Sequence, residues 1–164
     1  MMRLQIVIAI GVVLLVPVAA SAQDRGWAAE VSVGWAGLVD DATKNYRLVG
    51  GTVRRHVSPR VSVGPEFVIM SNSDLLRDRI VMLTGNVVFD AVPDARVSAF
   101  AIGGLGMFWG REQLRNGPYW SSDPAFTAGG GLRANLTESV AVGGEYRIGW
   151  ELHQRVTGFA RVRW

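Results

Sequence analysis

The chain has 164 residues, of which 49% are hydrophobic and 19% charged, and it contains 20 glycines and no cysteine. This length fits one ordinary domain, and the lack of cysteine excludes a disulfide scaffold, a cysteine-ligated zinc site and a thiol nucleophile. The net charge is +3, but the basic residues are scattered, whereas a nucleic-acid surface gathers them on one face. The many glycines argue against a mostly helical protein, because Gly costs about 1 kcal/mol in a helix interior.

Residues 1–22 have the features of a secretory signal peptide. Arg3 precedes an apolar run over residues 6–16, and residues 20–22 (Ala-Ser-Ala) offer the small side chains that a signal peptidase accepts. The run is shorter than the roughly 20 apolar residues that a membrane-spanning helix needs. We therefore expect the leader to be removed and a mature domain to begin at residue 23.

The mature sequence alternates with a period of two in segment after segment. Between residues 140 and 150, one set of alternate positions reads Val, Val, Gly, Tyr, Ile, Trp, and the other reads Ala, Gly, Glu, Arg, Gly. Successive side chains of a strand point to opposite faces, so each segment has one apolar face and one small or polar face. The alternation predicts eight strands, with the least regular phase in the fifth: residues 27–37, 46–57, 61–70, 79–91, 97–110, 126–136, 140–150 and 156–164.

The connections between these strands alternate in length. Tight turns rich in Pro, Asp and Ser are expected at residues 58–60, 92–94 and 137–139, and longer polar loops at residues 39–45, 71–78, 111–124 and 151–155. An even number of antiparallel strands with alternating short and long connections is typical of membrane barrels. We therefore predict an all-β fold: an eight-stranded antiparallel up-and-down transmembrane β-barrel over residues 23–164.

Alternation alone does not say which face is outside. A soluble lipocalin-like carrier of a small apolar ligand has its apolar face inside and gives the same pattern. Here the second face carries Gly, Ala and Ser with isolated charges, which suits the narrow interior of an eight-stranded barrel. An unpaired charge would be costly there, so we expect a lumen charge network of Glu30, Arg54, Glu66, Arg133, Glu145, Arg147, Arg161 and Arg163.

Aromatic residues mark the ends of the predicted strands. Trp27, Trp35, Tyr146, Trp150 and Trp164 all fall on the apolar face. Trp and Tyr collect where hydrocarbon meets water, in two girdles around a membrane barrel. These residues are therefore predicted to form an aromatic girdle, and outer-membrane lipid is predicted to contact the apolar face.

Residues 129–147 (GGGLRANLTESVAVGGEYR) resemble the penultimate hairpin of the outer-membrane β-barrel family, which includes the transmembrane domain of outer membrane protein A. The ending Val162-Arg163-Trp164 is similar to the signal that the barrel assembly machinery reads, although Gly158 lies one residue further from the end than in the usual pattern. The resemblance implies a monomer in the outer membrane of a Gram-negative-type bacterium, with that machinery as a partner. Because the sequence stops at Trp164, we expect no peptidoglycan-binding domain.

The chemistry of an enzyme finds little support. His56 and Ser58 have a His-x-Ser spacing similar to that of barrel-type lipid A deacylases, but they adjoin a short turn, away from the outer leaflet where lipid A lies. His153 stands two residues from Glu151 without an obvious nucleophile, and catalysis needs nucleophile, base and orienting group together. We therefore predict no catalytic residue, no cofactor and no metal site, and a lipid A-modifying barrel enzyme is the less favoured alternative.

The function that these patterns favour is a structural or surface-interaction role in the outer membrane. An aqueous channel needs roughly 16 strands, so an eight-stranded barrel is expected to be filled by side chains and not to conduct. A candidate external contact loop contains Arg111, Arg115, Tyr119 and Trp120, although an ordinary hairpin loop with an Asn-Gly turn at residues 116–117 fits the same stretch.

Overall fold

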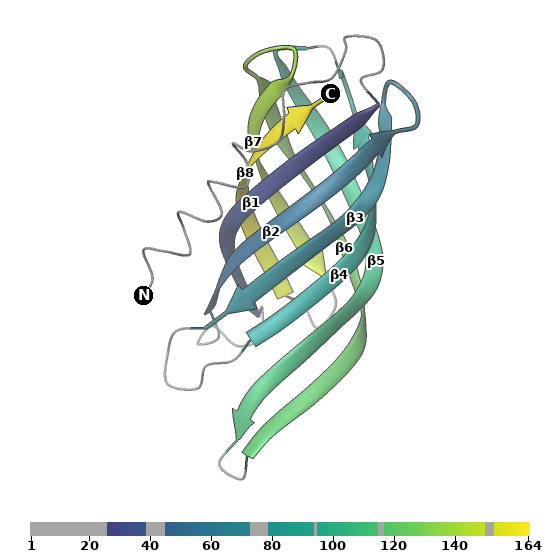
Figure 1. Ribbon diagram of the computed structural model, residues 1–164. Helices are drawn as coiled ribbons and strands as arrows, with labels where there is room; N and C mark the ends of the chain where they lie inside the picture. Colours follow the sequence, from purple (N-terminus) through teal and green to yellow (C-terminus); the bar gives the residue numbers. More distant parts are fainter. Residues whose placement is uncertain (1–25, 39–44, 73–78, 94, 115–116, 150–152) are drawn as a thin grey trace.

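The computed structural model describes residues 26–38, 45–72, 79–93, 95–114, 117–149 and 153–164, without the side chains of residues 38 and 111–119. These residues form a closed barrel in which each strand is antiparallel to its neighbours along the chain (Figure 1). Among them there is no helix long and apolar enough to cross a membrane. The strands are β1 (Trp27–Leu38), β2 (Asn45–His56), β3 (Val61–Ser71), β4 (Arg79–Asp90), β5 (Val97–Leu114), β6 (Gly117–Asn135), β7 (Val140–Gly149) and β8 (His153–Arg163). The predicted eight-stranded antiparallel barrel is confirmed.

The first and last strands close the ring. β1 and β8 pair from Ala28 opposite Arg163 to Leu38 opposite His153. Beyond that ladder, the N–H of Trp27 donates to the carbonyl of Trp164 at 3.1 Å, and the N–H of Trp164 donates back to the carbonyl of Trp27 at 3.0 Å. Because of this closure, the two strands at the ends of the domain have hydrogen-bonded partners on both sides.

The two ends of the barrel differ in their connections (Figure 1). The turns after β2, β4 and β6 lie at one end, here called the turn end, together with the start of β1 and the end of β8. These turns are tight because side chains cap them: Ser58 Oγ accepts from the N–H of Val61 at 3.1 Å, and Thr137 Oγ1 accepts from the N–H of Val140 at 2.9 Å. The β5–β6 hairpin projects from the opposite end, here called the loop end.

Two predicted loops were wrong. β5 and β6 have 18 and 19 residues and pair out to Leu114 opposite Gly117, so most of the loop expected at residues 111–124 is paired strand. The polar composition of that stretch predicted a loop, but backbone pairing between the two strands continues through it regardless of side-chain polarity. β8 likewise begins at His153, which moves Arg155 from the loop expected at residues 151–155 into a strand.

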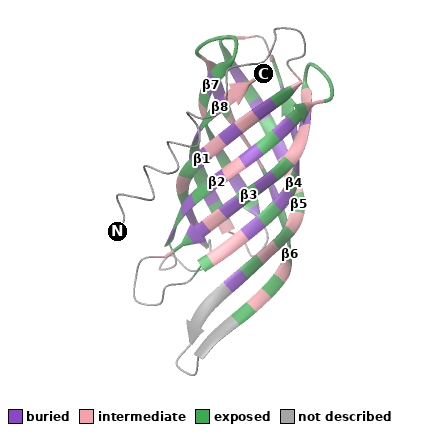
Figure 2. Cartoon of the chain, in the orientation of Figure 1, coloured by how far each residue is buried: buried purple, intermediate pink, exposed green. Residues whose placement is uncertain are grey.

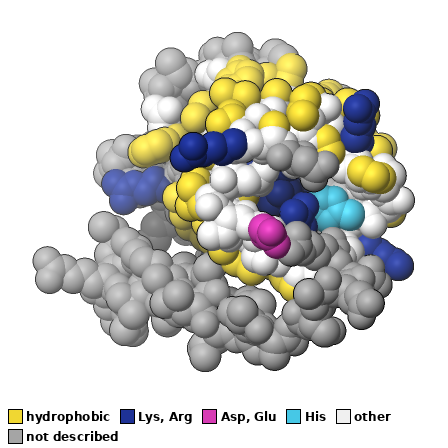
Figure 3. All heavy atoms as spheres, turned by 90° about the horizontal axis from the view of Figure 1, so that it is seen from above, with side chains coloured by type: hydrophobic (Ala, Val, Ile, Leu, Met, Phe, Trp, Pro, Cys, Tyr) yellow, Lys and Arg dark blue, Asp and Glu magenta, His cyan; other side chains and the backbone are white. Residues whose placement is uncertain are grey.

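Buried and exposed residues alternate along the strands (Figure 2). The apolar set predicted from the sequence points outward: Val33, Val87 and Val156 are each more than half exposed. The charged set points inward, with Glu66, Arg133 and Arg161 buried. Seen from the turn end, hydrophobic side chains form much of the outer surface; a His side chain and basic side chains beside it lie toward the middle, while other basic side chains lie around the edge (Figure 3). A soluble carrier would require the opposite arrangement.

The interior also contains apolar side chains, which the sequence analysis did not predict. Near the turn end, the rings of Phe100 and Phe159 meet edge to face with centroids 5.8 Å apart, beside Val88 and Ile102. A second group, called here the loop-end apolar cluster, consists of Ala36, Tyr46, Leu48, Val68, Met70, Met82 and Ala125, with Ile80 and Phe108 packed against it. The loop-end apolar cluster lies in the interior near the loop end, and the remaining interior holds the charged groups together with the apolar group of Phe100 and Phe159.

Candidate functional site

Glu66 is the centre of the charged interior. Its carboxylate accepts a hydrogen bond from Arg147 Nη1 at 2.9 Å, and Arg155 Nη2 lies 2.9 Å from both of its oxygens. Asn86 Nδ2 donates to the same group at 3.0 Å and Thr84 Oγ1 at 3.3 Å. Asn86 and Thr84 lie on β4, the neighbour of β3, which carries Glu66. Arg147 on β7 and Arg155 on β8 lie on strands that are not adjacent to β3, so this carboxylate links opposite parts of the barrel wall.

A second carboxylate completes the group. Arg147 Nη2 lies 2.8 Å from one oxygen of Glu145 and 2.9 Å from the other, and Thr157 Oγ1 donates to Glu145 at 3.1 Å. Arg155 Nη2 is 3.8 Å from Glu145 as well. The two acids and two arginines balance in charge, which is the condition under which buried ions are tolerated. We call this group the central network: Glu66, Glu145, Arg147 and Arg155.

Two further ion pairs lie outside the central network. Arg54 on β2 holds Glu30 on β1 with two parallel hydrogen bonds, of 3.1 Å and 3.0 Å, in the bidentate geometry that the guanidinium fork favours. Arg133 Nη1 on β6 lies 2.7 Å from Asp90 Oδ1 on β4. All four side chains are buried. Each pair is therefore neutral and withdrawn from water.

The predicted charge network divides in the structure. Glu66, Glu145 and Arg147 meet in the central network, and Glu30 pairs with Arg54. Arg161 is buried, whereas Arg163 lies at the rim of the turn end and donates to the carbonyl of Glu138 at 3.1 Å. Arg163 was predicted in the interior network, and the last residue of β8 lies too close to the rim for that.

Sequence reasoning missed two charged residues of the interior. Arg155 was assigned to a loop, and Asp90 was not selected although it lies in a predicted strand. The period of two could have found both. Arg155 has the same parity as Thr157 and Arg161, and Asp90 the same parity as Asn86, and all of these face inward.

Several buried polar atoms have no hydrogen-bond partner among the described residues. Arg155 Nη1, Asn86 Oδ1 and Thr127 Oγ1 are among them. Four arginine Nε atoms, of Arg54, Arg133, Arg147 and Arg155, and His56 Nε2 complete the set. Such atoms are costly in an interior. The charged interior therefore contains many ion pairs and hydrogen bonds, but some of its buried donors and acceptors have no partner among the described residues.

Of the residues considered for catalysis, His56 and Ser58 are not joined in a site. Ser58 is exposed, and its hydroxyl accepts from the N–H of Val61. His56 is half-buried at the turn end, and within the described residues no hydrogen bond joins it to Ser58. Glu151, which is close to His153 in sequence, lies outside the described residues. No group of three potential metal ligands occurs in the described part of the chain.

The predicted girdle residues lie on the outer surface where they are described. Trp27, Trp35 and Tyr146 are exposed, and the guanidinium of Arg55 lies 5.8 Å from the ring centroid of Trp27. Trp164 is half-buried at the turn end beside Trp27. Trp150 lies outside the described residues.

The candidate external contact residues lie on the projecting hairpin. Trp120 is 66% exposed. The backbones of Arg111 and Tyr119 belong to β5 and β6, in which Arg111 is opposite Trp120 and Tyr119 is opposite Glu112. Arg115 lies outside the described residues. The three contact residues that the structure describes are thus carried by paired strands rather than by an irregular loop.

Comparisons with known proteins agree with this geometry. The model of the family described as outer membrane protein beta-barrel domain matches residues 6–157. Neisserial surface protein A is similar in structure, with a TM-score of 0.70 at 9% sequence identity, over 84% of this chain and 96% of that one. The N-terminal β-barrel domain of Pseudomonas aeruginosa OprF gives 0.62 at 11% identity, over 84% and 97%.

The attachment invasion locus protein Ail of Yersinia pestis is a third similar structure, with a TM-score of 0.55 at 15% identity, over 84% of this chain and 95% of that one. At such identities the similarity shows the fold. A comparison with curated proteins found no significant match. The family match spans nearly the whole chain. The protein therefore belongs to the outer membrane β-barrel family, the barrels of the Gram-negative outer membrane.

Proposed function

We propose that the protein is an integral outer-membrane barrel with a structural or surface-interaction role and that its interior does not conduct. The observation that carries this proposal is the filling of the interior along its length. The loop-end apolar cluster occupies one part, the central network the middle, and the pairs Glu30–Arg54 and Asp90–Arg133 the part toward the turn end. Eight strands leave an interior that side chains can fill, unlike the wide lumen of a porin.

The central network is the main obstacle to a passing ion. The side chains of Arg147 and Arg155 are 0% and 1% exposed, and both contact Glu66 from across the barrel. A hydrated ion would have to separate these pairs, and removing one partner from a buried pair typically costs about 3–5 kcal/mol. This cost supports a closed interior.

The proposal includes an orientation and a route. A signal peptide over residues 1–22 directs export, the turn end faces the periplasm and the loop end faces outward, as in barrels with short periplasmic turns. The barrel assembly machinery reads β8 and its aromatic ending. The barrel acts as a monomer, because every strand already has two neighbours within one chain.

The projecting β5–β6 hairpin supports a surface role. It extends beyond the pairing of β6 with β7, which stops at Thr127 opposite Gly149. Exposed Trp120 lies in this extension, opposite Arg111 in the strand register and next to Tyr119 in the chain. Aromatic and arginine residues are enriched among the residues that dominate binding at protein interfaces.

The conductance of the purified protein tests the proposal. Protein refolded in detergent is expected to migrate differently before and after heating, and to give no stable single-channel steps in a planar lipid bilayer. The paired variant R147A/R155A, in which two large interior side chains are removed, serves as a control that the assay detects opening. Stable conductance steps from the unmodified protein would contradict a filled, non-conducting interior.

A further inference from the structure

The buried charges of the described interior do not cancel. Arginine cannot lose its proton in a protein, and a buried charge without a partner is strongly unfavourable. One positive charge is therefore left over when four buried acids are set against five buried arginines: Glu30, Glu66, Asp90 and Glu145 against Arg54, Arg133, Arg147, Arg155 and Arg161.

The unbalanced arginine is Arg161. Its residue is 4% exposed, and among the described residues no acid lies within ion-pair distance of its guanidinium. In the strand register it is opposite Glu30 on one side and Ala141 on the other. Both oxygens of Glu30 already accept hydrogen bonds from Arg54, and Ala141 contributes no charge. Asp90 and Glu30 are the acids that act on the charge of Arg161, but each already pairs with another arginine, so Arg161 has no ion-pair partner of its own among the described residues.

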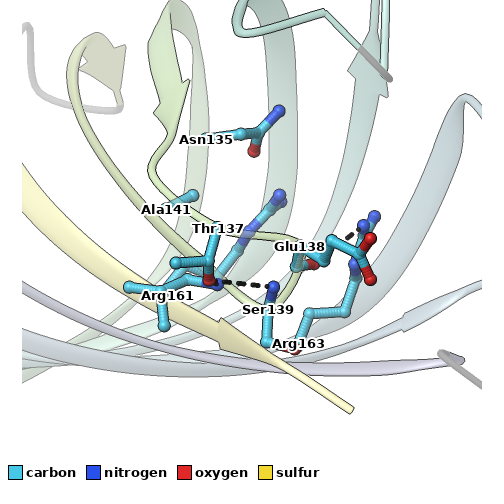
Figure 4. Close-up of a pocket in the computed structure, with 8 residues that line it drawn as sticks. Asn135, Thr137, Glu138, Ser139, Ala141, Arg161 and Arg163 are labelled. Carbon is cyan, nitrogen blue, oxygen red and sulfur yellow. Dashed lines mark hydrogen bonds between the residues drawn. The ribbon is translucent and has the colours of Figure 1, made fainter. Parts of the chain in front are cut away.

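Arg161 borders a small pocket under the β6–β7 turn (Figure 4). In Figure 4 the side chains of Arg161 and Arg163 both extend from β8 toward this turn, and Arg163 reaches the carbonyl of Glu138. The lining is mainly polar, so it suits a polar ligand. We call this feature the turn-end pocket, and its lining residues are Asn135, Thr137, Glu138, Ser139, Val140, Ala141, Arg161 and Arg163.

A second unsatisfied group lies near these cations. His56 Nε2 is buried and has no hydrogen-bond partner among the described residues. The charged groups that act most strongly on its imidazole are the guanidinium groups of Arg161 and Arg163. Arg163 has an acceptor in the carbonyl of Glu138, but Arg161 has none among the described residues, and a neutral imidazole with its proton on Nε2 would be a further donor.

We propose that the turn-end pocket binds a small oxyanion, of the phosphate, sulfate or carboxylate class, between Arg161 and Arg163, with His56 as a further donor. The planar guanidinium fork binds such groups with two parallel hydrogen bonds. The pocket has no space for a water-sized group in this structure, and at its rim Arg163 contacts the carbonyl of Glu138. The anion therefore enters as the Arg163 side chain, which is long and lies at the rim, leaves that carbonyl.

Inorganic phosphate is the probe for the test. It is titrated by calorimetry into protein refolded in dodecyl maltoside, at constant ionic strength set with sodium chloride, and sodium acetate and sodium sulfate arms separate carboxylate from phosphate-like ligands. We expect saturable binding, weakened at least about tenfold in R161Q, since a hydrogen bond to a charged group contributes about 1.5–3 kcal/mol. The matched control is R96Q, which changes an exposed arginine of the turn end outside the pocket and should bind as the unmodified protein does.

A second variant introduces an acidic side chain beside Arg161 to act as its ion-pair partner. A141D places a carboxylate opposite Arg161, so it should abolish anion binding and raise the unfolding temperature in buffer without phosphate. The proposal is overturned if the unmodified protein does not bind any of the three anions saturably. It is also overturned if phosphate stabilises the unmodified protein, R161Q and A141D equally, because a general salt effect then explains the result. Neither outcome bears on conductance, so the proposed function is tested separately.

Discussion

Arg155 Nη2 lies 2.9 Å from both carboxylate oxygens of Glu66, although the two residues are 89 positions apart in the sequence. They come from β8 and β3, which are not neighbours in the sheet. The contact therefore crosses the interior instead of following the wall. With Arg147, it makes Glu66 the residue through which three parts of the barrel are joined.

Replacing Glu66 with glutamine should destabilise the barrel strongly. E66Q leaves Arg147 and Arg155 to share Glu145 alone, and breaking a buried ion pair by removing one partner costs about 3–5 kcal/mol. The free energy of unfolding, measured by urea titration of protein folded in lipid vesicles, checks this. The control E138Q changes an exposed turn residue and should cost less than about 1 kcal/mol. Equal losses in the two variants would show that the central network does not stabilise the fold.

A charge on the outer surface should be costly at the middle of a strand and cheap at its end. Val33, midway along β1, is 57% exposed, and Val57, just past β2 at the turn end, is 59% exposed. V33R should lose about 2–4 kcal/mol in a bilayer, and V57R about 0–1 kcal/mol, because the cost of arginine depends on depth in the lipid. Unfolding from vesicles measures both. If V33R and V57R lose the same free energy, the outward valines do not face hydrocarbon.

Gly64 should not tolerate a methyl group. A Cβ built at Gly64 would overlap the backbone carbonyl oxygen of Val53 on the neighbouring strand, whereas at Gly51 the nearest such atom, the carbonyl oxygen of Glu30, is 3.9 Å away. Overpacking of this kind costs about 1–3 kcal/mol. G64A is therefore expected to unfold at lower urea concentration than the unmodified protein, while G51A should unfold at the same concentration or slightly higher. Identical behaviour of the two variants would argue against close approach of β2 and β3 at Gly64.

The projecting hairpin should be dispensable for folding. β4 pairs with β5 as far as Arg111, and residues 112–114 and 117–119 pair only with each other. Replacing residues 112–119 with an Asn-Gly turn, which suits a two-residue hairpin, should change the free energy of unfolding by less than about 1 kcal/mol, because an isolated two-stranded hairpin is marginally stable at best. Heat-dependent migration and urea unfolding measure the result. Loss of the folded form would mean that the extension supports the barrel.

The strands and their inward and outward faces could be predicted because alternation is a local signal. β7 shows this best, since Glu145 and Arg147 are buried while Tyr146 and Ile148 are exposed, as their parity requires. The ion-pair partners of the buried charged residues were harder to predict. Nothing near Arg133 in the sequence indicates Asp90, because the contact depends on how β4 and β6 face each other inside the ring.

The interior apolar side chains and the long hairpin were missed for different reasons. Val68 and Met82 are apolar residues on the inward face, so they break the rule that assigned apolar side chains to the outside. Their place depends on the volume left by the small residues around them. The hairpin was missed because polar and proline residues at 111–124 are typical of loops, while its strands are held by their own backbone pairing.

The pairing of β1 with β8, described above as the closure of the ring, has a consequence for how the protein is made. β1 is synthesised before the other strands, but it acquires its second hydrogen-bonded neighbour only when β8, the last strand, is present. The barrel cannot close until β8 is available to pair with β1. The whole polypeptide must therefore be synthesised and protected from aggregation before the barrel closes. A truncated product lacking β8 would have unpaired edges at β1 and β7, and unpaired strand edges are templates for aggregation.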